Sequence, residues 1–295
     1  MGKKQRRKKH SNKKKKKSTP KLPFRVTKIF DDPTGGLVNM RLNLAMMNLA
    51  KYTDLDENEK TDLFRLLVLI SRKSVSVWRH YQAYIKAEDE LIKSAKKKKH
   101  VDVLSQDLFI EFDEFLVQTK STLDYLVKVP RIIFGEKAWS LRTFGNKGDD
   151  VIKMLENNIP DRFKKNAKGV AVILKGHQDW LRSIVEARDR INHYIDGGID
   201  IEFFAVVRDD NGKIHVPRFA SDQTVREALK ASWEYLFQLC EDFLGLVIAF
   251  RTKKGFAFFH GRRDMSSHDS VWAIITQETM ETIVSEEGWT AIGDV

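Results

Sequence analysis

The sequence has a single cysteine, Cys240, in 295 residues, which excludes an internal disulfide and any zinc cluster built on cysteines. Cys240 falls on the apolar face of a predicted helix, so we expect it to be a core residue. No apolar run approaches the roughly 20 residues of a membrane-spanning helix. No apolar segment follows the basic N-terminus, as it would in a secretory signal peptide. These absences predict a soluble cytoplasmic protein without a membrane partner.

Acidic residues are absent from the first 22 positions, which carry twelve Lys and Arg residues. Removing these twelve from the total of 52 leaves 40 basic against 41 acidic residues, so the rest of the chain is close to neutral. A segment with little to bury and with charges that repel one another does not fold alone, and we predict that residues 1–23 are a disordered basic tail. The basic residues of this tail are Lys3, Lys4, Arg6, Arg7, Lys8, Lys9, Lys13, Lys14, Lys15, Lys16, Lys17 and Lys21.

The basic tail has four readings that its charge alone does not separate. It is a solubilising or expression-related arm, or an electrostatic tether to the phosphates of RNA or DNA that weakens steeply with salt. In a eukaryotic source it would also suit a nuclear address, and an anionic membrane surface would attract it too.

Several common site motifs are missing as well. The chain has no Gly-x4-Gly-Lys-Ser/Thr loop, no dinucleotide fingerprint after a strand, no His-Glu-x-x-His and no Gly-x-Ser-x-Gly elbow. No compact cluster of histidines and carboxylates has the spacing of metal ligands. We therefore predict neither a cofactor nor a metal.

Apolar residues at helical spacing dominate the chain from residue 37 onward. A short amphipathic helix is expected after a structure-breaking connector over residues 24–36, with its stripe on Leu37, Met40, Leu44 and Met47. A helix over residues 57–95, capped by Asp54 or Asp56, comes next. The cleanest stripe is that of the following helix, which Pro130 should end near Val129. Its apolar positions are Leu104, Leu108, Phe112, Phe115, Thr119, Leu123 and Leu126.

The second half of the chain continues this pattern with one interruption. Helices are predicted over residues 148–158 and 163–195, and Ser221 or Asp222 should open a last long helix that ends near Phe250. Between them, Asn211-Gly212 separates two β-rich runs and predicts a hairpin at residues 202–219. Residues 255–259 form either a short strand or a packed patch, and residues 270–285 are expected to be helical.

These elements predict a mainly α-helical fold, a multi-helix up-down bundle with a small β-hairpin insertion. One domain is expected over residues 37–251, with a C-terminal extension over residues 252–295.

A dense cluster of charge closes the helix predicted at residues 163–195. Arg188 lies four residues after Ile184 and three before Ile191, so it falls inside the apolar stripe, where a permanent charge is costly unless it is paired or faces a crevice. Arg188 and His193 lie roughly 140° apart on a regular helix. Asp189 shares a face with His193, at a spacing of four residues.

Arg188-Asp189-x-x-x-His193 resembles the Arg-polar-x-x-x-His signature of HEPN domains, the small helical bundles of many prokaryotic RNases and toxins. The resemblance covers about residues 56–251. It implies an endoribonuclease that needs no metal and leaves a 2′,3′-cyclic phosphate and a 5′-hydroxyl. An arginine can bind the scissile phosphate and a histidine can move a proton at neutral pH. Asp189 would support the imidazole, and Asn192 would bond to phosphate or to the neighbouring helix.

In HEPN enzymes two motifs meet across an interface. The single copy here therefore implies a homodimer with a composite active site that acts on RNA, compatible with a toxin or antiviral defence role and with an antitoxin or other regulatory partner. In such bundles a polar residue of an early helix also supports the cluster. Which of them does so stays open, since Glu111, Asp113, Glu114, Lys120, Ser121 and Asp124 are all candidates.

One departure from the family concerns tyrosine. Some HEPN toxins carry Arg-x4-His-x-Tyr, whereas here Tyr194 follows His193 directly and Ile195 stands at the tyrosine position, so regulation through that residue is not carried over.

A second reading gives the motif no chemistry. Arg188, Asp189 and Asn192 would then be interhelical partners, with His193 near a frayed helix end. The protein would be a non-catalytic helical module that binds nucleic acid or a partner protein, with the basic tail as its main contact.

Overall fold

The computed structural model describes a bundle of long helices with two small antiparallel sheets. It describes residues 33–97, 102–145, 148–193, 204–219, 222–262 and 270–276. The helical elements are α1 (Pro33–Asn39), η1 (Met40–Ala45, a π-helix), α2 (Met46–Ala50), α3 (Glu57–Lys97), α4 (Gln106–Leu126), α5 (Val129–Phe134), α6 (Asp149–Asn157), η2 (Asp161–Phe163, a 3-10 helix), α7 (Lys164–Gly176), α8 (Gln178–His193) and α9 (Val225–Ala249). The strands are β1 (Asp102–Leu104), β2 (Ala205–Arg208), β3 (Ile214–His215), β4 (Phe256–Arg262) and β5 (Ser270–Thr276).

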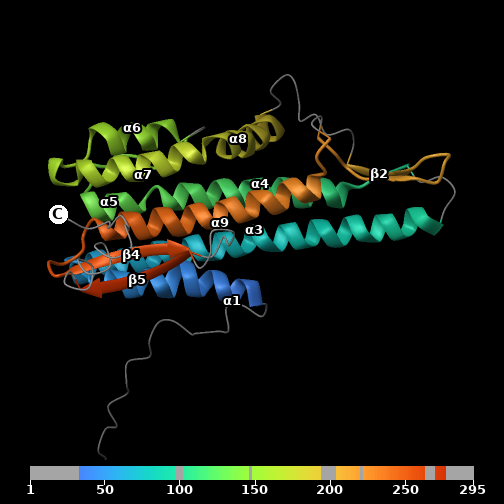
Figure 1. The fold of residues 1–295 in the computed structure, drawn as a ribbon. Helices are drawn as coiled ribbons and strands as arrows, with labels where there is room; N and C mark the ends of the chain where they lie inside the picture. The colour runs from blue at the N-terminus through green and yellow to red at the C-terminus, as the bar shows by residue number, and fades with distance from the viewer. Residues whose placement is uncertain are drawn as a thin grey trace, which may run out of the picture.

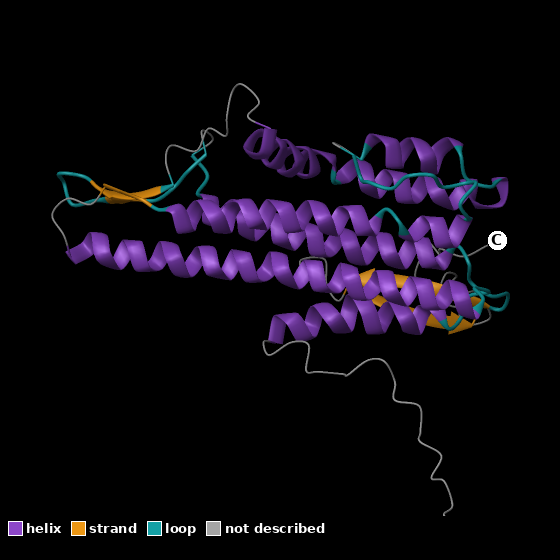
Figure 2. Cartoon of the chain, turned by 180° about the vertical axis from the view of Figure 1, so that it is seen from behind, coloured by secondary structure: helices purple, strands orange, loops and turns teal. Residues whose placement is uncertain are grey.

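The helices are stacked in layers along a common direction (Figure 1). Helices α3, α4 and α9 form the centre, where α3 packs along α4 and both contact α9. Helices α6, α7 and α8 cover the α4 side, whereas α1, α2 and the β4–β5 hairpin lie on the α3 side, as the opposite view also shows (Figure 2). This arrangement confirms the predicted mainly α-helical bundle with a small β insertion.

Side-chain caps set the starts of the long helices. Asp56 caps α3, because its carboxylate accepts the backbone N–H of Glu59 at 2.8 Å while the Glu59 carboxylate accepts the N–H of Asp56 at 2.9 Å. The capping box of α9 is built by Thr224 and Glu227 rather than by Asp222. The alternative of Ser221 lies outside the described residues.

The predicted stripes of α4 and α9 form the core. On α4, the described side chains of the predicted stripe are all buried, from Leu108 to Leu126. On α9 the apolar residues at helical spacing are buried too, among them Leu229, Leu236, Phe243 and Val247, and Cys240 is a fully buried core residue, as predicted. Burial of apolar area of this kind is the main favourable contribution to folding.

The predicted hairpin is present and belongs to a larger sheet. Strands β2 and β3 pair antiparallel around the turn at Asn211-Gly212, where Gly212 has a φ of 84° that suits glycine. Strand β1, which was not predicted, pairs with β2 in the register Val103↔Val206 and so links the α3–α4 connection to the segment before α9. In both views this sheet lies past the ends of α4 and α9 and alongside the C-terminal end of α3, which it contacts.

The N-terminal helical segment corrects two predictions. It begins at Pro33, inside the segment expected to break structure. Most of the expected stripe faces solvent, since Met40 and Leu44 are each 53 % exposed and only Met47 packs against the core. The fully buried residues are instead Val38, Leu42 and Met46. These buried residues recur every four positions, which suits the wider turn of the π-helix that they span.

Three further boundaries differ from the prediction. The helix expected over residues 163–195 is two helices, α7 and α8, separated at His177. Helix α4 ends at Leu126 rather than near Val129, and Pro130 stands in the first turn of α5, where its missing N–H costs nothing.

The third difference concerns the secondary structure of the C-terminal extension. Residues 270–276, expected to be helical, form β5, which pairs with β4 in the register Phe258↔Ile274. Of the two alternatives for residues 255–259, the strand is the right one, because Phe256–Arg262 form β4, and Phe258 is also buried in the main core. Among the described helices, none combines the length and apolar composition needed to cross a membrane.

Candidate active site

The motif helix α8 is held against α4 by an apolar face. Leu181, Ile184 and Val185 are buried, and α8 contacts α4 along this face. Arg188 follows Ile184 by one turn, and its side chain is only 31 % exposed. The structure therefore places the guanidinium at the edge of the α4–α8 interface, as its position in the stripe predicts.

The first carboxylate beside Arg188 is that of Asp189. The Arg188 guanidinium donates from Nη1 to Oδ1 of Asp189 at 2.9 Å, and the Asp189 side chain is 22 % exposed. Partial burial of both groups strengthens this pair relative to an ion pair in open solvent. The pair lies within α8, so by itself it does not join two helices.

A second carboxylate, Asp113, approaches from α4. Burial raises the pKa of the Asp113 carboxyl above its ordinary value, the charge of Glu114 raises it further, and the Arg188 guanidinium acts in the opposite direction. Arg188 and Asp113 are thus within electrostatic reach of one another. Among the described residues no group donates a hydrogen bond to the buried Oδ1 of Asp113.

Among the acids of α4, Asp113 is one whose carboxyl interacts electrostatically with a motif residue, Arg188. Glu111 instead meets Nδ1 of His80 on α3 at 2.7 Å. Asp124 accepts from Lys120 at 2.6 Å and from the backbone N–H of Phe144 at 2.8 Å. The sequence did not distinguish these acids, because each sits on a polar face of α4 and only the docking of α8 selects one of them.

The last two residues of the motif are placed by their backbone alone. Helix α8 continues through Asn192 and ends at His193. Their side chains lie outside what the structure describes, so the proton-transfer role of His193 and the bonding role of Asn192 stay predictions. The basic tail, from Lys3 to Lys21, also lies outside the described residues.

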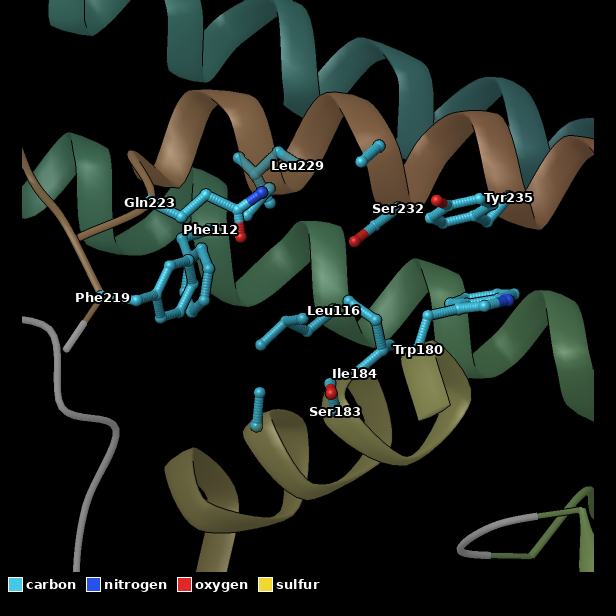
Figure 3. A pocket seen from close by; sticks show the side chains of 13 residues that line it. Phe112, Leu116, Trp180, Ser183, Ile184, Phe219, Gln223, Leu229, Ser232 and Tyr235 are labelled. Atoms are coloured by element: carbon cyan, nitrogen blue, oxygen red, sulfur yellow. The ribbon is translucent and has the colours of Figure 1, made fainter. Parts of the chain in front are cut away.

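An open groove of about 340 Å³ lies beside the motif, between α4, α8 and α9 (Figure 3). Sequence patterns did not predict it, because it depends on side chains from three helices that are far apart in the chain. Its lining residues are Phe112, Leu116, Trp180, Ser183, Ile184, Ala187, Phe219, Gln223, Ala228, Leu229, Ala231, Ser232 and Tyr235.

The histidine in the stripe before the motif has a structural partner. His177 ends α7, and its Nδ1 accepts a hydrogen bond from Nε1 of Trp180 at 2.8 Å. This bond gives His177 a structural role at the junction of α7 and α8. Within the described ranges, no three His, Cys, Asp or Glu side chains gather as ligands for a metal ion.

Comparison with known proteins adds no relative: no protein-family model, no curated protein and no solved structure matches this chain.

Proposed function

We propose that the protein is a metal-independent endoribonuclease of the HEPN type. The observation that supports this most is the position of Arg188, a permanently charged side chain two-thirds buried at a helix interface, beside Asp189 and within reach of Asp113. A guanidinium held in this way is suited to bind a phosphate bidentately and to stabilise the negative charge that develops on it.

The proposed reaction uses the RNA as its own nucleophile. His193 accepts the proton of the 2′-hydroxyl while the 2′-oxygen attacks the adjacent phosphorus. The bond from phosphorus to the 5′-oxygen breaks, and that oxygen receives a proton from a second imidazole, His193 of the partner subunit. The products are a 2′,3′-cyclic phosphate and a 5′-hydroxyl.

Two features of this proposal follow from the resemblance. A composite site requires a homodimer in which both copies of α8 contribute Arg188 and His193. Cleavage of cellular RNA harms the host unless it is controlled, which suits a cytoplasmic toxin or antiviral effector held by an antitoxin or other regulator. The basic tail would raise the encounter rate with RNA in a manner that depends on salt.

The test is RNA cleavage in EDTA by the wild type and by His193→Ala, with analysis of the product ends. We expect cleavage that leaves cyclic phosphates in the wild type and a loss of at least about 100-fold in the variant, the usual contribution of a general acid or base. The control is His215→Ala, since His215 lies on β3 in an exposed pair with Asp209.

Equal cleavage by the His193→Ala and wild-type proteins would overturn the proposal. No cleavage by either, together with RNA binding that disappears when residues 1–22 are deleted, would favour the non-catalytic binding module instead. Cleavage that survives deletion of the tail would support the enzyme.

A further inference from the structure

The groove beside the motif exists because facing positions carry small side chains. Helix α8 presents Ser183 and Ala187 to it, and α9 presents Ala228, Ala231 and Ser232. Side chains this short do not meet across the interface, so the space between α8 and α9 stays unfilled. Its volume of about 340 Å³ is at the lower end of the roughly 300–1,000 Å³ of small-ligand pockets.

Aromatic rings stand at the two ends of the groove (Figure 3). At one end Trp180 of α8 stacks on Tyr235 of α9, with centroids 6.1 Å apart and ring planes at 23°. The hydrogen bond to His177 fixes the indole ring in this orientation. At the other end Phe112 and Phe219 lie with their centroids 6.3 Å apart.

Polar groups are few and stand among these rings. The hydroxyls of Ser183 and Ser232 and the amide of Gln223 belong to the lining. The amide of Gln223 and the hydroxyl of Ser232 can both donate and accept hydrogen bonds, whereas the hydroxyl of Ser183 donates to the carbonyl of Asp179 at 3.0 Å and leaves an acceptor. Together they can meet the mixed donors and acceptors on the edge of a heterocyclic ring.

The groove runs toward the motif. Along α8 the lining begins at Trp180 and passes Ile184 to Ala187, and Arg188 is the next residue. On α4 the lining residue Phe112 directly precedes Asp113. Asp113 interacts electrostatically with Arg188, so the phenylalanine end of the groove is the end nearer to the guanidinium, which carries the positive charge that a phosphate requires.

We propose that this groove holds one unpaired nucleobase of the RNA, whose neighbouring phosphate is bound by Arg188. This inference rests on the proposed ribonuclease function and names its substrate as single-stranded RNA. Flat apolar walls with a few hydrogen-bonding groups suit a base ring, since unpaired bases are recognised by stacking on aromatic side chains and by contacts to their edges.

The test fills the groove and measures the binding of its ligand. Ala231→Leu and Ser232→Leu each place a larger side chain into the space, and Thr61→Leu makes a comparable change on the exposed surface of α3. The probes are the four nucleoside 3′-monophosphates, with ribose 5-phosphate as the probe without a base, and the readout is titration calorimetry.

We expect at least one nucleotide to bind more tightly than ribose 5-phosphate. The two groove variants should weaken it by about tenfold or more, within the range that loss of a base–aromatic stack produces. Thr61→Leu should bind as the wild type does. If a leucine variant fails to fold, Tyr235→Ala removes one ring of the wall from a position that is 42 % exposed, and it should weaken binding to a similar degree.

Absence of nucleotide binding, or leucine variants that bind and cleave like the wild type, would overturn the inference while leaving the ribonuclease intact. If the groove binds nucleotides but the protein cleaves no RNA, the base-binding inference stands and the ribonuclease proposal fails.

Discussion

Two arginines of this protein sit in similar surroundings and are bonded differently. Arg226 on α9 and Arg188 on α8 are 33 % and 31 % exposed, and each lies near two carboxylates at a helix interface. Arg226 joins two helices, since it pairs with Glu88 and Asp89 of α3 at 2.5 Å each and donates to the carbonyl of Ile85 at 3.3 Å.

The described ion pair of Arg188, by contrast, is with its chain neighbour Asp189. Asp113, the carboxylate across the interface, interacts with Arg188 electrostatically. An arginine whose bonds cross between helices contributes to stability, because removing it leaves its partners buried without compensation. The pair of Arg188 with Asp189 is local to α8 and partly exposed, so breaking that pair should cost less stability. The two sites should therefore respond to mutation in opposite ways.

The largest effect is expected at Arg188. Arg188→Ala should lower RNA cleavage by roughly 100- to 1,000-fold, the usual loss when one stabilising donor of a transition state is removed. Its free energy of unfolding should fall by about 1–2 kcal/mol, because the partly exposed pair with Asp189 contributes little and the buried Asp113 loses a nearby positive charge. Cleavage rates check the effect on activity, and urea denaturation checks the effect on stability. The control is Arg182→Ala, which removes the same charge from the exposed face of α8.

At Arg226 the balance should be reversed. Arg226→Ala leaves Glu88 buried without its counter-charge, and we expect a loss of about 2–4 kcal/mol in the free energy of unfolding, somewhat reduced by the partial exposure of the arginine. Adding Glu88→Gln should restore part of the loss. Arg218→Ala, which breaks an exposed pair with Asp222, should cost less than about 1 kcal/mol. A larger loss in the free energy of unfolding for Arg188→Ala than for Arg226→Ala would contradict the comparison.

The smallest effect concerns pH. Burial raises the pKa of the Glu88 carboxyl above its ordinary value of 4.5, against the opposing charge of Arg226. The folded protein then holds this proton more tightly than the unfolded chain, so the contribution of Glu88 to stability falls as pH rises from 4.5 through the folded-state pKa and is level above it. Glu88→Gln should flatten this dependence. Denaturation of the wild type and of Glu88→Gln across that pH range measures the difference in pH dependence, with Glu90→Gln as control. Parallel curves of unfolding free energy against pH would refute the prediction.

Local sequence patterns were sufficient for the long helices. The stripes of α4 and α9 and the Asn211-Gly212 turn specify their elements without help from distant residues. The register of the first helices was missed because a π-helix changes the spacing of the buried face. Strand β1 has three residues and depends on pairing with β2, about a hundred positions later.

The candidate site was predictable only in part. Arg188 stood out, since a charge inside an apolar stripe is visible in one helix alone. Asp113 did not, because its relation to Arg188 arises when α8 docks on α4. The groove could not be predicted for the same reason, since small residues such as Ala187 and Ala231 line a common space only once α8 and α9 have packed.

The β2–β3 turn, from Asp209 to Gly212, has a practical consequence for engineering the chain. This turn belongs to the sheet past the ends of α4 and α9, and the backbone N–H of Gly212 donates to the carbonyl of Asp209 at 2.9 Å, which closes the turn locally. Exposed tips of this kind tolerate added residues. A fluorescent or affinity peptide inserted between Asp210 and Asn211 should report on the protein in cells without touching α8, and circular permutants could begin at the same point.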